Sequence, residues 1–123
     1  MFMLYIAAII LVITALGGLT LATIHFRSKG RKFPPKVLAL MHGAAGAAGL
    51  IILILALLRV GFSTLAGVSL GLFVIAALGG FTLFSFHLRN KPLPSTFVVV
   101  HGLVALTALA LLLVVIFAGS TLA

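Results

Sequence analysis

Four long apolar segments, separated by three short connections, constrain this chain more than any other feature of its sequence. A helix needs about 20 apolar residues to cross the roughly 30 Å hydrocarbon core of a membrane. The segments cover about residues 2–27, 35–59, 64–89 and 94–118, so each is long enough to span. None shows the sustained period-two alternation that a membrane β-barrel requires. The sequence therefore predicts an all-α integral membrane protein, a four-helix bundle that forms a single domain over residues 1–123.

The charged residues support a membrane location and predict an orientation. Charged residues make up 7% of the chain, with no Asp or Glu, whereas a soluble domain carries about a quarter. The basic residues cluster at the connections and do not form the stripe of a nucleic-acid-binding surface. They are Arg27, Lys29, Arg31, Lys32 and Lys36 at the first connection, Arg59 at the second, and Arg89 and Lys91 at the third. By the positive-inside rule, connections one and three are cytoplasmic and both termini lie outside, as expected in a bacterial inner membrane.

An internal repeat relates the two halves of the chain. Residues 15–27 read ALGGLTLATIHFR and residues 77–89 read ALGGFTLFSFHLR, with 8 of 13 positions identical at an offset of 62 (87 − 25 = 62). The match resumes at His42 and His101, each followed by glycine, at an offset of 59 (101 − 42 = 59). The sequence therefore contains two copies of one helical hairpin, residues 1–60 and 61–123.

The repeat and the short connections together predict how the helices are arranged. Short connections make neighbouring helices antiparallel, as in an up-down bundle. Each copy is one hairpin that begins and ends on the same side, so the copies are parallel repeats related by an axis along the membrane normal. In such a bundle, helices one and three lie diagonally opposite each other, as do helices two and four.

All four histidines of the chain belong to the repeat, as two matched pairs. Ionisable residues inside a membrane span are costly and by default indicate a functional site. His42 and His101, here called the deep pair, each lie seven residues past a proline, on the order of 10 Å into their helices. His25 and His87, the end pair, each lie two residues before an arginine, near the cytoplasmic boundary.

Two histidines on diagonal helices of a bundle can ligate one haem iron from both faces. The deep pair is the best candidate for this role, and the end pair is a candidate for a second haem. Arg27 and Arg89, beside the end pair, would suit the haem propionates electrostatically. The alternatives are interhelical hydrogen bonds for the deep pair and interfacial positions among lipid headgroups for the end pair.

Glycines near the histidines offer room for a flat cofactor. They follow His42 on one face of the second helix, and on the first and third helices they precede the histidine on its face. The glycines singled out are Gly46 and Gly49 on the second helix, Gly18 on the first and Gly80 on the third. A porphyrin enters a four-helix bundle only where side chains are small. Close helix–helix packing without a cofactor explains the same glycines, so both interpretations stay open.

These paired histidines and glycines resemble the four-helix transmembrane b-type cytochromes, in which histidines on diagonal helices hold haem without covalent attachment. The resemblance covers the whole bundle and implies one or two non-covalent haem b groups and a role in electron transfer. Members that move electrons across the membrane usually place haems toward opposite sides, whereas here all four histidines lie toward one side. Besides the lipid bilayer, the compatible partners are a quinone or a redox protein on the cytoplasmic side, and pairing within a homo-oligomer stays open.

Other function classes use the same residues differently. A small carrier or channel would bind protons or a metal ion at the histidines, although the chain has no carboxylate to complete a proton relay or to orient a metal ligand. A structural subunit of a membrane complex would use the glycines as interfaces. No hydrolase or transferase signature is present, so any enzymatic activity would be that of a haem-based oxidoreductase.

Overall fold

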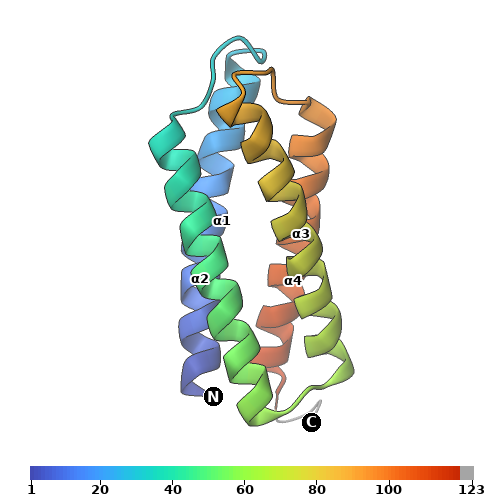
Figure 1. The fold of residues 1–123 in the computed structure, drawn as a ribbon. Helices are drawn as coiled ribbons and strands as arrows, with labels where there is room; N and C mark the ends of the chain where they lie inside the picture. Colours follow the sequence, from blue (N-terminus) through green and yellow to red (C-terminus); the bar gives the residue numbers. More distant parts are fainter. Residues whose placement is uncertain (120–123) are drawn as a thin grey trace.

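The chain forms an up-down bundle of four helices, and the computed structural model describes residues 1–119 (Figure 1). The helices are α1 (Phe2–Arg27), α2 (Lys36–Val60), α3 (Thr64–Leu88) and α4 (Ser95–Phe117). Each end lies within one residue of the end expected from the apolar segments. All four helices are long and apolar enough to cross a membrane, which confirms the predicted all-α fold. Residues 120–123, the end of the predicted domain and of its second repeat copy, lie outside the described residues.

The helices occupy the corners of a square. Helices adjacent in sequence pack together, most closely within the hairpins α1–α2 and α3–α4, and α1 also packs against α4. Within residues 1–119, the backbones of α1 and α3 do not approach each other, and neither do those of α2 and α4. These two pairs are therefore the diagonals, as predicted.

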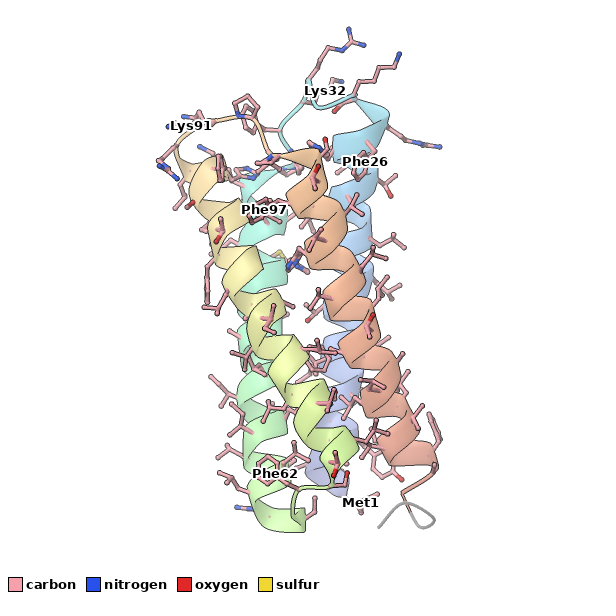
Figure 2. The ribbon with its side chains drawn as sticks, turned by 90° about the vertical axis from the view of Figure 1, so that its right-hand side faces the viewer. Met1, Phe26, Lys32, Phe62, Lys91 and Phe97 are labelled. Atoms are coloured by element: carbon pink, nitrogen blue, oxygen red, sulfur yellow. The ribbon has the colours of Figure 1, made fainter. Side chains whose placement is uncertain are left out.

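One end of the bundle carries nearly all of the positive charge. The start of α1 and the end of α4 lie at the same end, and the connections 28–35 and 89–94 lie at the other (Figure 1). Lys32 and Lys91 project from this second end, whereas Met1 and Phe62 lie at the first (Figure 2). We call the second end the basic end. Its basic residues are Arg27, Lys29, Arg31, Lys32, Lys36, Arg89 and Lys91.

Proline and serine define where three of the helices begin. Pro35 and Pro94 immediately precede the first turns of α2 and α4, with φ angles of −55° and −66° that suit entry into a helix. Neither N-terminus has a side-chain cap. At α3, by contrast, the Ser63 hydroxyl accepts a hydrogen bond of 3.2 Å from the Ala66 amide, as capping serines do. Within the described residues, the two helices that begin at the basic end thus start without a side-chain hydrogen bond to their first amides.

The interior is packed differently in its two halves. In the half away from the basic end, here called the aliphatic half, buried apolar side chains from all four helices form the core. They include Leu4, Ala7, Leu11, Leu53, Leu57, Ala66, Phe73, Ala108 and Leu112. In the other half, here called the histidine half, no residue of the segments 12–24, 35–48, 77–86 and 95–107 is buried. Side chains at the level of the deep pair are therefore less buried than those of the aliphatic half.

Candidate functional site

The structure brings the two histidines of the deep pair together across the bundle. His42 on α2 and His101 on α4 come from diagonal helices, and their ring centroids lie 6.2 Å apart. The ring planes are inclined by 84° to each other. Two imidazoles from opposite corners of the bundle thus meet near its axis.

Each ring of the deep pair is anchored in the same way within its own hairpin. His42 Nδ1 donates to the carbonyl oxygen of Thr14 at 2.8 Å, and His101 Nδ1 donates to the carbonyl oxygen of Ala76 at 2.9 Å. Thr14 and Ala76 are equivalent positions of the repeat (76 − 14 = 62). Because a carbonyl oxygen only accepts, each Nδ1 carries the proton, and a neutral ring then leaves Nε2 unprotonated. This tautomer, fixed by a backbone carbonyl, is the one that metal-binding histidines adopt.

Glycines of the partner helix make the space for both rings. A Cβ atom on Gly18 would lie 2.7 Å from Cε1 of His42, and one on Gly80 would lie 3.2 Å from Cε1 of His101. Along the sequence, these glycines share helix faces with the end pair, but the side chains that fill the space beside them belong to the deep pair. Gly18 and Gly80 therefore belong to the candidate site through their contacts with the imidazoles.

Gly46 and Gly49 have a different role. A Cβ atom on Gly46 would lie 3.3 Å from Cγ2 of Thr14, and one on Gly49 would lie 2.9 Å from Cγ of Leu11. Both contacts are with α1 inside the first hairpin. These two glycines let α2 approach α1 closely, which is the alternative to a cofactor contact that the sequence left open.

The end pair is buried, and its two rings have different surroundings. His25 and His87 are each 3% exposed, so the rings are not wetted as an interfacial position would require. His25 Nε2 lies 2.9 Å from the Ser95 hydroxyl at the start of α4. His87 lies beside Phe33 and Phe84, with ring centroids 5.8 Å and 6.2 Å away. Within residues 1–119, the two rings of the end pair make no direct ring contact with each other.

The burial of the end pair was missed by sequence reasoning, and so was Ser95 as a partner. Serine directly after a proline is typical of a helix start, which gave no reason to connect Ser95 with a histidine 70 residues earlier. The internal repeat could have pointed to Ser95, because Ser95 and Lys36 occupy equivalent positions but are different residues (95 − 36 = 59). A difference between two copies at a helix end marks a position where the copies use different contacts.

The two arginines near the end pair face outward. Arg27 is exposed. Arg89 is also exposed, and it donates to the carbonyl oxygen and to the hydroxyl of Ser85, each at 3.2 Å. Its guanidinium lies 5.5 Å from the centre of the Phe86 ring. Arg89 is thus held along its own helix, and its contacts give no support to a propionate-binding role.

The donor set limits which metal the deep pair can hold. Within the described residues, no group of three or more His, Cys, Asp or Glu side chains gathers at one point. A bare zinc ion normally has four ligands, of which at least three come from protein side chains. Two imidazoles on opposite sides instead suit an iron whose remaining ligands come from a porphyrin.

The chain matches no protein-family model, no curated protein and no solved structure. A fold of four membrane helices is compatible with many functions, so the function is inferred from the geometry of the site. The site consists of two matched imidazoles, two carbonyl anchors and two glycines.

Proposed function

We propose that this chain is a membrane b-type haem protein that functions in electron transfer. In this proposal, His42 and His101 bind one haem iron from opposite sides. The observation that carries the proposal is the matched arrangement of the two rings, each fixed by a carbonyl at Nδ1 and separated by 6.2 Å between centroids. Two metal–imidazole bonds of about 2.0–2.1 Å each, plus the distances from nitrogen to ring centre, span roughly 6 Å. The separation therefore suits two ligands of one metal.

The residues around the rings hold and orient them. The Thr14 and Ala76 carbonyls fix the tautomer of each ring and raise the basicity of its free nitrogen. Gly18 and Gly80 let each imidazole lie against the neighbouring backbone. Haem held by His42 and His101 would supply one-electron chemistry.

The proposal assigns one haem to the chain. At the end pair, Ser95 already lies within hydrogen-bonding distance of His25 Nε2, and the two buried rings have different partners. A second haem would require His25 to give up this contact and both rings to turn toward a common centre. The deep pair needs neither change.

The location of the deep pair supports electron exchange on the cytoplasmic side of a bacterial inner membrane. The histidine half adjoins the basic end, which the positive-inside rule places in the cytoplasm. An open groove of about 270 Å³ between α3 and α4 reaches His101 from the lipid-facing surface, and its lining includes Gly79, Thr82 and Phe97. A lipid-soluble quinone is the partner that this groove favours, ahead of a soluble redox protein.

Haem retention by histidine variants tests the proposal. The protein is expressed with haem supplied and purified in mild detergent, and the haem-to-protein ratio is measured by a pyridine haemochrome assay. We expect His42→Ala and His101→Ala each to abolish haem retention, because one axial imidazole is lost in each. The matched variant His25→Ala should keep its haem. Full haem content in both deep-pair variants would refute the assigned ligation.

A further inference from the structure

His87 has a buried nitrogen without a hydrogen-bond partner among residues 1–119. Its Nε2 atom is buried and has no hydrogen-bond partner within the described part of the chain, and the residue is 3% exposed. Buried polar atoms in native proteins almost always have a partner, so this exception calls for an explanation, and a group bound from outside the chain is one. The Phe33 ring lies 5.8 Å from the His87 ring and belongs to the connection 28–35, outside any helix. Phe33 is 45% exposed, so the His87 ring is covered on this side by a side chain at the surface of the protein.

The end of the bundle that holds this nitrogen is basic and contains no acidic side chain. Lys36 is the first residue of α2 and follows Phe33, whose ring lies 5.8 Å from the His87 ring, by three positions. The first turn of α2 contains no acidic residue and has no side-chain cap, so its backbone amides point out of a helix N-terminus, which attracts anions. The whole chain contains no Asp or Glu. No side chain can therefore neutralise this cluster, and the balancing anion must come from outside the chain.

We propose that His87, Lys36 and the first turn of α2 bind the phosphate group of an anionic phospholipid at the basic end. Basic pockets between membrane helices are typical sites for such headgroups. The imidazole, the ammonium group and the free amides supply donors for the phosphate oxygens. Val37 and Leu88, next to Lys36 and His87 in sequence, are 71% and 57% exposed and offer apolar contacts to the acyl chains. A free phosphate ion would use the same donors but not these apolar contacts.

The first hairpin provides an internal comparison. His25, the equivalent of His87, is partnered by Ser95 at 2.9 Å, and Ser95 occupies the position equivalent to Lys36. Of the two equivalent ends of the repeat, the one with the unpartnered histidine nitrogen is therefore also the one with the lysine. The proposal accordingly predicts one preferred lipid site per chain, and it does not depend on haem at the deep pair.

Native mass spectrometry of the full chain in a zwitterionic detergent tests the site. Palmitoyl-oleoyl phosphatidylglycerol is titrated against palmitoyl-oleoyl phosphatidylcholine, and one phosphatidylglycerol adduct is expected to form preferentially. Lys36→Gln should weaken this adduct roughly fivefold, the factor that one lysine near an anionic surface is worth. The matched control Lys32→Gln removes the same charge from the tip of the connection, away from the helices, and should leave the affinity unchanged (Figure 2). His87→Leu should weaken the adduct as well, whereas His25→Leu should not.

Three results would overturn the proposal. If Lys36→Gln and Lys32→Gln weaken the phosphatidylglycerol adduct equally, the lipid is attracted to the basic end by its overall charge and not bound at a specific site. Unchanged binding in both His87→Leu and Lys36→Gln would exclude these residues. Displacement of the lipid by inorganic phosphate at low millimolar concentration would assign the donors to a free anion. Haem content is measured on the same samples, and it should be unchanged in Lys36→Gln, so a failure of the lipid site is distinguishable from a failure of the haem site.

Discussion

The two histidine pairs differ in how similar their side-chain contacts are in the two hairpins. At the deep pair, both rings donate from Nδ1 to the equivalent carbonyl and lie against the equivalent glycine. At the end pair, one ring has a hydroxyl partner, and the other has a buried nitrogen that has no partner within residues 1–119. A single group bound between two rings constrains both in the same way, whereas rings with separate contacts are free to differ. The agreement at the deep pair is therefore the stronger indication of a shared ligand.

The first prediction concerns a glycine substitution that disturbs the contacts of one ring of the deep pair, and it has the largest expected effect. Gly18→Ala places a methyl group 2.7 Å from His42 Cε1, a distance at which the ring must move, whereas Gly80→Ala leaves 3.2 Å to His101 Cε1. Overpacking of this kind costs about 1–3 kcal/mol, and we expect Gly18→Ala to lie at the upper end of that range. The haem-to-protein ratio should fall strongly in Gly18→Ala and only slightly in Gly80→Ala.

Two glycines elsewhere on the same helices as the deep pair provide the control. A Cβ atom on Gly43 or Gly102 would meet no atom of the described residues within 4 Å. Gly43→Ala and Gly102→Ala should therefore keep full haem content. If these variants lose haem as readily as Gly18→Ala, then loss of glycine in general is responsible, and the close contact with the imidazole is not.

The second prediction exchanges the partners of the end pair. Ser95→Ala leaves His25 Nε2 buried without a partner and should lower the free energy of unfolding by about 1–3 kcal/mol. Lys36→Ser gives His87 the residue that His25 has and should raise the free energy of unfolding by about 0.5–1.5 kcal/mol. Both are measured by denaturation in a zwitterionic detergent free of anionic lipid. Unchanged stability in both variants would mean that the residues at positions 95 and 36 do not cause the difference between the His25 and His87 rings.

The third prediction concerns the aliphatic half and has the smallest expected effect. The buried Ser69 hydroxyl donates to the Ala108 carbonyl oxygen at 2.8 Å, whereas the equivalent position in the first hairpin is Ala7 (69 − 7 = 62). Interhelical hydrogen bonds in membranes are worth about 0.6 kcal/mol on average, so Ser69→Ala should lower the unfolding free energy by about that amount. Thr107→Ala, which removes an exposed bond within its own helix, should change it less. A larger loss in Thr107→Ala than in Ser69→Ala would contradict this account.

The fold followed from the sequence because membrane helices are specified by length and hydropathy. Each apolar segment ends at a proline, a basic residue or a short polar connection, and the helices begin and end within one residue of those points. The diagonal arrangement followed from the short connections. The meeting of His42 and His101 followed from that arrangement together with the repeat.

The side-chain contacts could not be predicted to the same extent, because each helix is apolar on all faces. Without a polar stripe, the sequence does not show how a helix is rotated about its own axis. Gly18 therefore looked like a neighbour of His25 along one face, whereas it contacts His42 on the next helix. Gly46 looked like part of a cofactor site, whereas it contacts Thr14. The partners of the end pair depend on how the connections fold at the basic end, which hydropathy does not describe.

The visible spectrum of the purified protein tests the central claim most directly. The protein is expressed with haem supplied, purified in mild detergent, and measured oxidised and then reduced with dithionite, with haem quantified against protein. We expect a sharp Soret band, narrow α and β bands on reduction, and a ratio of about one haem per chain, as two axial imidazoles on one iron require. A protein that stays colourless when haem is supplied would contradict the account.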